Sequence, residues 1–421
     1  MNSRERVRKA INHEQPDKVP LDLGSTSVTG IHVTAYSKLK KTLGVKGGEI
    51  RVCDPYQMLA EVEESVRRAL GVDTFGIQLP YTVFGYRNEN WKPWRLFDGT
   101  EVMVSGHFQY DIAPDGSVLV YPAGDRSAPP SGKMPRDGYY FDVIVRQPPF
   151  EEADLDPKEW VEQTYSLYTD EDMAYLEKVS RLAYEETDYS IIGNFCDGGL
   201  GDIGIVPGPH IGYPSGIRDP EEWYISLSMR KEYIKEVFGY QTELGLKNLK
   251  MYSEAVGDRI DVIDVSETDF GIQTGLLASK DTFRELFKPF FTEINLWIHQ
   301  NTAWKTFYHS CGSISELLED FIECGVDIIN PVQYGAANME LSFLKKEFGK
   351  SIVFWGGGID TQRILPFGQP DEVQEEVMNN IKTLSKNGGF VFCTVHNIQP
   401  DVPEDNIRAM FDAFSRWREY S

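Results

Sequence analysis

Residues 326–355, VDIINPVQYGAANMELSFLKKEFGKSIVFW, contain one complete strand–helix–strand unit. VDIIN (326–330) and IVFW (352–355) are short, apolar and β-branched or aromatic, which is typical of buried strands. Between them, Met339–Phe348 has the apolar spacing of an amphipathic helix. A strand, a helix of about ten residues and a second strand form the repeating unit of a parallel sheet.

The same alternation continues on both sides of this unit. We predict further strands at Val19–Leu23, Val72–Gln78, Tyr189–Phe195, Ile260–Val265, Ala303–Tyr308 and Phe390–Val395. We predict helices at Arg4–Asn12, Met58–Leu70, Met173–Thr187, Pro220–Val256, Asp281–Asn301, Ser313–Cys324, Asp371–Lys386 and Glu404–Trp417. Eight strands separated by helices predict an α/β fold, a (β/α)8 TIM barrel, with residues 1–421 as a single domain. An open doubly wound sheet is the alternative, but no glycine-rich nucleotide fingerprint follows the first strand.

One region departs from this alternation. Residues 85–147 are rich in Gly, Pro and Asp and contain β-type runs such as EVMVSGHFQYDI and GSVLVYP. This pattern predicts antiparallel β-hairpins inserted after the second strand. Barrel active sites lie at the carboxyl ends of the strands, so we expect the insertion to lie near the active-site face. The alternative is an insertion away from that face.

The composition excludes several classes of function. The chain of 421 residues has 65 acidic and 42 basic side chains, a formal net charge of −23. It therefore lacks the basic surface that nucleic-acid binding requires. No uncharged apolar run approaches the ~18 residues that span a bilayer, and the charged N-terminus does not resemble a secretory signal. Five cysteines are too few for a disulfide framework, so we expect a cytoplasmic protein with free thiols.

Residues with metal-binding side chains follow the predicted strands. His309 and Cys311 are two residues apart at a strand end, so their side chains share a face. Cys393 is in the last predicted strand, and His396 follows it. Zinc binds imidazole nitrogen and thiolate sulfur, and catalytic zinc keeps three protein ligands and one open position. We predict His309, Cys311 and Cys393 as ligands, with His396 as a reserve ligand or a substrate contact; ordinary buried thiols are the alternative.

Two carboxylates, Glu267 and Asp269, follow the strand Ile260–Val265. We predict that they serve as a general acid or orient a zinc ligand. Capping of the following segment is the alternative. Cys196, in the run Cys-Asp-Gly-Gly, is interpreted as part of a tight turn.

Several motifs resemble the uroporphyrinogen decarboxylase-like superfamily. They are Ser3–Val7 (SRERV) and Asp17–Pro20 (DKVP) near the start, Asp269–Gly275 (DFGIQTG), His309–Gly312 (HSCG), Gly325–Pro331 (GVDIINP) and His396–Pro403 (HNIQPDVP). The resemblance covers most of the chain outside the hairpin region and implies a (β/α)8 barrel. The decarboxylase's arginine-bearing N-terminal loop has no match, because Gly24–Thr29 (GSTSVT) occupies that region.

Within the superfamily the chain resembles the cobalamin-dependent methyltransferases. In that branch a His-x-Cys pair and a distant Cys hold zinc, which His309, Cys311 and Cys393 match. The resemblance implies transfer of a methyl group from a small methylated substrate to the Co(I) corrinoid of a separate protein. No DxHxxG cobalamin-binding signature is present, so a corrinoid-binding partner protein would supply the cofactor.

The substrate prediction depends on aromatic residues near the hairpins, namely Tyr81, Phe84, Tyr86, Trp91 and Trp94. They favour a flat aromatic substrate, so an aryl methyl ether is the predicted methyl donor, to be cleaved by O-demethylation. We expect the substrate to contact Tyr81, Phe84, Asn194, Gln333, Trp355 and His396. The alternatives are a methylcobalamin:thiol methyltransferase of the coenzyme M type, a decarboxylase of another small acid, and an inactive binding partner of a corrinoid protein. A homodimer is compatible with the sequence.

Overall fold

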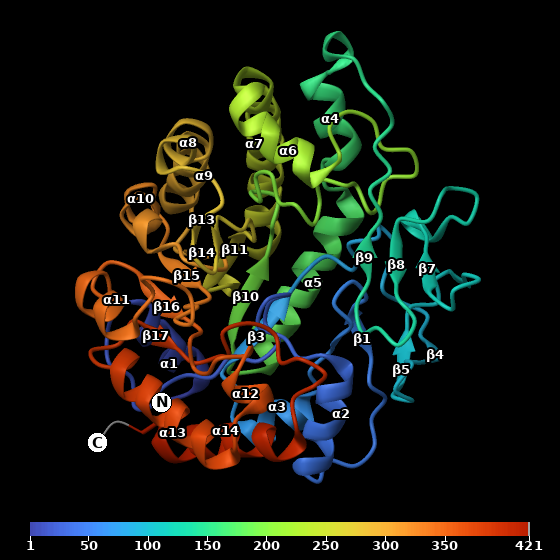
Figure 1. The fold of residues 1–421 in the computed structure, drawn as a ribbon. Helices are drawn as coiled ribbons and strands as arrows, with labels where there is room; N and C mark the ends of the chain where they lie inside the picture. Colours follow the sequence, from blue (N-terminus) through green and yellow to red (C-terminus); the bar gives the residue numbers. More distant parts are fainter. Residues whose placement is uncertain (420–421) are drawn as a thin grey trace.

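The fold is built around a curled sheet of seven parallel strands (Figure 1). The computed structural model describes residues 1–419. In sheet order the strands are β17 (Phe390–Val391), β16 (Val353–Trp355), β15 (Ile328–Asn330), β14 (Lys305–His309), β11 (Val262–Ser266), β10 (Ser190–Asn194) and β3 (Thr74–Ile77). Each strand corresponds to one of the predicted strands. The mixed α/β fold and the half-barrel curl of this sheet are consistent with a TIM-like barrel.

The predicted first strand, Val19–Leu23, lies between the two edges of this sheet. Leu21 forms an isolated parallel bridge with Phe392, which directly follows β17. On its other side, the carbonyl of Leu21 accepts a hydrogen bond of 2.8 Å from the amide of Asp73, which directly precedes β3. The segment is not a regular strand, but its backbone connects the first and last strands of the sheet.

Strand residues alternate between two hydrophobic clusters. The inner cluster contains Val28, Ile192, Val262, Phe307, Ile328, Val353, Trp355, Val391 and Cys393. The residues between them, such as Ile191, Ile263 and Tyr308, belong to the outer cluster that the helices cover. This period of two is what places the residues at the strand ends either inside the barrel or against the helices.

Helices follow most of the parallel strands. They are α1 (Ser3–Ile11), α2 (Val33–Thr42), α3 (Glu64–Leu70), α4 (Pro157–Thr164), α5 (Asp170–Glu186), α6 (Pro220–Met229), α7 (Lys231–Val256), α8 (Lys280–Leu286), α9 (Lys288–Asn301), α10 (Leu318–Glu323), α11 (Leu341–Glu347), α12 (Ile364–Phe367), α13 (Pro370–Leu384) and α14 (Glu404–Trp417). The predicted helix Met58–Leu70 is shorter than expected. Its first residues instead form β2 (Leu59–Ala60), which pairs with β1 (Val52–Asp54). Within residues 1–419 no helix is both long and apolar enough to cross a membrane.

Between β3 and α4 the chain forms antiparallel strands, which lie to one side of the parallel sheet (Figure 1). One pair is β4 (Lys92–Arg95) with β5 (Glu101–Val104). A second sheet contains β6 (Tyr110–Ile112), β7 (Val118–Val120), β8 (Gly132–Met134) and β9 (Asp142–Val143). Another short antiparallel pair, β12 (Gly271–Ile272) and β13 (Gly275–Leu276), follows β11.

Candidate active site

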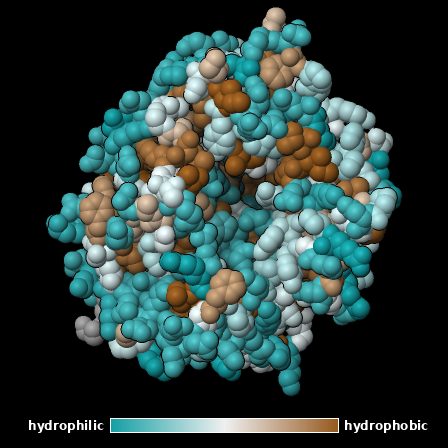
Figure 2. Space-filling model, in the orientation of Figure 1, coloured by the Kyte–Doolittle hydropathy of each residue, from teal (hydrophilic) through white to brown (hydrophobic). Residues whose placement is uncertain are grey.

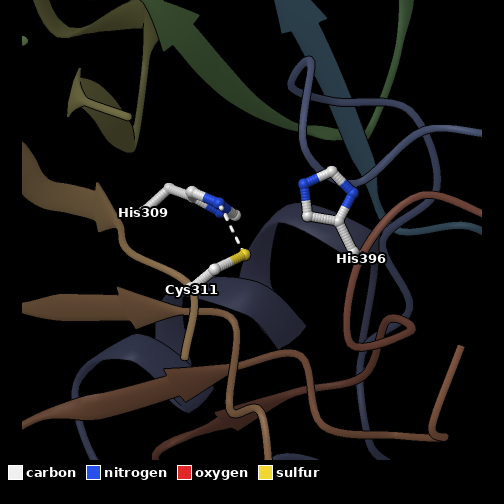
Figure 3. Close-up of side chains that lie close together, drawn as sticks. All are labelled: His309, Cys311 and His396. Atoms are coloured by element: carbon white, nitrogen blue, oxygen red, sulfur yellow. Dashed lines mark hydrogen bonds between the residues drawn. The ribbon is translucent and has the colours of Figure 1, made fainter. Parts of the chain in front are cut away.

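Three side chains that could hold a metal ion meet at the carboxyl end of β14. His309 ends this strand, Cys311 follows two residues later, and His396 comes from the loop after β17 (Figure 3). Their ligand atoms lie within 4.8 Å of one another, and the Cys311 Sγ is 3.3 Å from the His309 Nε2. The side chains of a strand end and a distant loop therefore face a common point.

Asn330 determines the orientation of the His309 ring. Its Nδ2 donates to the carbonyl of Trp355 at 2.8 Å, so its Oδ1 faces His309 and accepts from the His309 Nδ1 at 2.6 Å. Because Nδ1 carries the proton, the lone pair of Nε2 points toward Cys311. Metal-binding histidines commonly have this arrangement, in which the second ring nitrogen donates to a fixed acceptor.

Cys393 lies on the other side of Asn330 and is buried. Its Sγ is 3.8 Å from the Asn330 Nδ2 and belongs to the inner hydrophobic cluster. It is not one of the three residues that meet within 4.8 Å. A Cβ at Gly356 would lie 3.4 Å from this sulfur, so the glycine leaves room beside the thiol.

His396 is the residue that meets His309 and Cys311, and the lone pair of its Nδ1 is already used in a hydrogen bond. This atom accepts a hydrogen bond of 2.8 Å from the amide of Asn397. In the neutral ring the proton must then be on Nε2, which makes that nitrogen a hydrogen-bond donor. His396 is therefore arranged to donate a hydrogen bond.

Asp269 connects the loop after β11 to the loop after β14. Its Oδ1 accepts from the amide of Cys311 at 2.6 Å and lies 3.7 Å from the His309 Nε2. Ser310 adds a second connection, because its hydroxyl accepts from the amide of Phe270 at 2.9 Å. A Cβ at Gly312 would lie only 2.3 Å from the backbone of the facing loop, so the close approach requires glycine.

Burial keeps the nitrogen and sulfur groups of the site uncharged. It lowers the pKa of His309 to about 4, against the opposing hydrogen bond with Asn330. It lowers the pKa of His396 to about 3, and His309 acts in the same direction. Burial raises the pKa of the Cys311 thiol well above its usual value, and the charge of Asp269 adds to this effect. The imidazoles are neutral at pH 7, the form in which an unprotonated ring nitrogen can bind a metal.

Glu267, the other predicted carboxylate, belongs to a second group. Its carboxylate accepts a hydrogen bond from the hydroxyl of Ser27. One ligand atom each from Glu267, Cys196 and Asp264 lies within 4.8 Å of the other two. The prediction that Cys196 lies in a turn agrees with the hydrogen bond from the amide of Gly199 to its carbonyl at 2.9 Å. The sequence did not indicate that Cys196 and Asp264 meet Glu267.

The predicted substrate contacts have different environments. Gln333 is buried, and its Oε1 accepts from the amide of Gly312 at 2.7 Å. The Asn194 Nδ2 donates to the carbonyls of Ser25 and Ile77 at 2.9 and 3.1 Å. Both side chains thus hold loops beside the site.

The three predicted aromatic contacts differ in exposure and in their neighbours. Trp355 is fully buried in the barrel, where its Nε1 donates to Asp22 at 2.8 Å. Phe84 is fully buried against Tyr56 and Phe141. Tyr81 is 43% exposed and accepts a hydrogen bond from Arg87 at 3.1 Å. Of these three aromatic residues, only Tyr81 has substantial exposed surface.

The face of the molecule in Figure 2 is hollowed near its centre, and hydrophobic side chains lie around the hollow. Several carboxylates near the candidate site act on one another. Asp202, whose Oδ1 accepts from the amide of Gly204 at 2.8 Å, is influenced by the charges of Glu267 and Asp269. Burial is the main cause that raises the pKa of Asp202 to about 7.

The raised pKa of Asp202 predicts how stability changes with pH. The folded protein binds this proton up to about pH 7, whereas the unfolded chain releases it near pH 4. The folded state therefore holds more protons than the unfolded chain in this interval. As a result, the contribution of the Asp202 carboxyl group to the free energy of unfolding falls as pH rises from about 4 to about 7. In the Asp202→Asn variant, urea unfolding with a metal chelator present is expected to depend less steeply on pH in this window. An unchanged slope would contradict the assignment.

Two residues that contact the candidate site, Asn330 and Ser27, are not among the predicted ligands, catalytic carboxylates or substrate contacts. Asn330 ends a predicted strand at the level of His309, and the two residues pair in the register of β14 with β15. The sequence does hold a signal for Asn330: it ends the predicted strand that follows the strand of His309, and neighbouring parallel strands place their last residues side by side. Ser27 had no comparable signal, since its loop has no periodic pattern.

Comparisons with known proteins agree with this fold. The family Uroporphyrinogen decarboxylase (URO-D) matches residues 212–417, just under half of the chain, including β11, β14, β15, β16 and β17. Among solved structures, a methyltransferase from Methanosarcina mazei is similar, with a TM-score of 0.54, 15% identity and coverage of 99% of each chain. No curated protein matches the sequence. These similarities support the superfamily that the sequence motifs indicate, at the level of fold.

Proposed function

We propose that the protein is a zinc-dependent methyltransferase that moves a methyl group from a small methylated substrate to the Co(I) corrinoid of a separate protein. The observation that supports this most directly is the convergence of the His309 Nε2 and the Cys311 Sγ, 3.3 Å apart. The fold similarity to a methyltransferase is consistent with the proposal but does not identify the substrate. An aryl methyl ether is the proposed methyl donor.

The donor set suits zinc. Zinc binds an imidazole through an unprotonated nitrogen such as the His309 Nε2, and it binds cysteine as the thiolate, which the neighbouring Cys311 would supply. When bound, zinc supplies Lewis acidity toward an oxygen that becomes negative as its methyl group leaves. We propose Cys393 as the third ligand, reached by rotation of its side chain in the space beside Gly356.

His396 is the alternative to Cys393 as the third ligand, and the zinc content of variants distinguishes these two assignments. Because its Nδ1 accepts from Asn397, we expect His396→Gln to retain zinc and Cys393→Ala to lose it, as measured by mass spectrometry of the purified variants. Gln keeps a hydrogen-bonding side chain of similar reach, which makes it the matched substitution. Loss of zinc from His396→Gln with retention in Cys393→Ala would assign the ligand to His396 instead.

The chain's own residues have separate tasks in this proposal. Asp269 holds the Cys311 loop through the Cys311 amide and keeps a carboxyl group 3.7 Å from His309, where it can serve as a general acid. His396 presents its Nε2 proton to the substrate oxygen. Glu267 adds a further carboxyl group at the edge of the site.

We further propose that residues 85–147 form an insertion that makes one wall of the substrate pocket. Two contacts beside their last strand support this. The hydroxyl of Tyr140 donates to Gln399, which lies in the same loop as His396, and the carbonyl of Tyr139 is 3.1 Å from the His32 Nε2. A corrinoid protein would then dock on the open side of the barrel mouth.

A methyl-transfer assay tests the proposal. Purified protein loaded with zinc is mixed with free Co(I) cobalamin and an anisole-type donor, and methylcobalamin formation is followed by absorbance. We expect methylcobalamin and the free phenol in equal amounts. The absence of transfer from aryl ethers, methylated amines and thioethers would reject a methyl-donor-cleaving enzyme.

The alternative functions predict different outcomes in the same assay. A methylcobalamin:thiol methyltransferase would consume methylcobalamin when a thiol is added. A decarboxylase would release carbon dioxide from a small acid without any metal. Zinc binding and complex formation with a corrinoid protein, without turnover of any of these substrates, would indicate an inactive binding partner.

A further inference from the structure

Asp264 is a fully buried carboxyl group that accepts no hydrogen bond from the amide, hydroxyl or basic groups of the described residues, and the carboxyl group of Glu267 is its hydrogen-bonding neighbour. Its position in β11 shows where it points. Val262, two residues earlier, belongs to the inner cluster, and Ile263 and Val265 belong to the outer one. Because strand side chains alternate, Asp264 points into the barrel interior. An isolated carboxylate there is costly unless something pairs with it.

The nearest candidates to pair with it are themselves ligand-type side chains. Cys196, two residues after β10, and Glu267, directly after β11, each bring a ligand atom within 4.8 Å of Asp264 and of each other. The backbone holds two of them together, because the amide of Cys196 donates to the carbonyl of Asp264 at 3.0 Å. The hydroxyl of Ser27 holds Glu267.

From this convergence we propose a second zinc site formed by Cys196, Asp264 and Glu267. A thiolate and two carboxylates are all zinc ligands, and three protein ligands leave one position for water or substrate. With ordinary zinc–sulfur and zinc–oxygen bond lengths, neighbouring ligand atoms lie about 3.6 Å apart in a tetrahedron. The observed separations of up to 4.8 Å therefore require only small side-chain movements.

The geometry of Cys196 also fits a ligand role. Its φ of 57° is in the left-handed region, where a residue other than glycine costs about 1–2 kcal/mol. Cys196 as a residue has exposed surface. Binding releases to solvent the thiol proton of Cys196 and the proton held between the carboxyl groups of Asp264 and Glu267, and both carboxylates then bind the ion.

This second site shares no ligand with the set His309, Cys311 and Cys393, but Glu267 also borders the proposed methyl-transfer site, so the test measures metal content rather than activity. The test measures zinc in the purified full chain after equilibration with zinc and removal of the excess. We expect Cys196→Ala and Asp264→Asn each to bind one zinc ion fewer than the native chain. Cys324→Ala is the matched control, since Cys324 is a buried thiol outside both clusters, and we expect it to keep the full content.

The pattern across variants separates the two proposals. If only the His309 site fails, Cys311→Ala retains the native zinc content, while Cys196→Ala still loses an ion. If only the second site fails, Cys196→Ala and Asp264→Asn match the native chain, and the inference is overturned. Cobalt(II) substitution adds a readout that is independent of total metal: the thiolate-to-cobalt absorption is expected to decrease in Cys196→Ala and to remain in Cys324→Ala. Equal absorption in both variants would also overturn the inference.

Discussion

Replacing Cys311 with alanine is expected to lower kcat/KM for methyl transfer on the order of a thousandfold. The substitution removes one of the two side chains whose ligand atoms lie 3.3 Å apart, and with it the Lewis acid proposed to stabilise the leaving oxygen. Metal activation of this kind contributes several kcal/mol, and a thousandfold corresponds to about 4 kcal/mol. The measurement is the rate of methylcobalamin formation at low substrate concentration.

Cys324→Ala is the control for the loss of a buried thiol. Cys324 is 2% exposed, and among residues 1–419 its Sγ hydrogen-bonds to the carbonyl of Phe321. We expect its rate to remain within a few-fold of the native rate. A Cys311→Ala variant that binds no zinc and still transfers methyl groups at the native rate would contradict the mechanism.

Replacing Asp73 with alanine is expected to lower the free energy of unfolding by about 3–5 kcal/mol, the cost of leaving buried charges without a partner. One carboxylate oxygen of Asp73 accepts from Arg6 at 2.5 Å, and the other accepts from Arg418 at 2.7 Å and from the amide of Leu21 at 2.9 Å. Both arginines are buried, at 6% exposure each. The substitution also disconnects the segment that joins the two edges of the sheet.

Asp17→Ala provides the matched control. Asp17 accepts from the same Arg6 side chain, but it is 37% exposed, and exposed ion pairs contribute about 0–1 kcal/mol. Urea denaturation of the two variants is expected to separate them by at least about 2 kcal/mol. Equal destabilisation would mean that Asp73 has no special part in holding the barrel together.

Most of the fold was predictable from the chain because its signals are local. The strand pattern of VDIIN and the helix spacing of Glu404–Trp417 depend on neighbouring residues only, and α14 begins and ends as predicted. One exception is Met58–Leu70, where Leu59 and Ala60 pair with β1; the predicted helix Pro220–Val256 also divides into α6 and α7. Pairing with a distant strand overrides local helix preference, and no local pattern reports it.

The candidate site was predictable only in part, for the same reason. His309 and Cys311 are neighbours in one strand end, so their spacing alone brings them together. Which residue joins His309 and Cys311 as the third member of the candidate site depends on the path of the loop after β17. It also depends on the position of Asn330, which lies between His309 and Cys393. Side-chain rotation and loop path are tertiary properties.

The sequence by itself determined the alternation of strands and helices, the His-x-Cys pair and the acidic character of the chain, because each is a property of composition or of short spacing. Only the tertiary structure decided that Cys196, Asp264 and Glu267 meet. Cys196 and Asp264 are 68 residues apart in the sequence and are brought together by the pairing of β10 with β11. Parallel strands are joined by long connections, so residues that become neighbours through parallel pairing cannot be recognised from a short stretch of sequence.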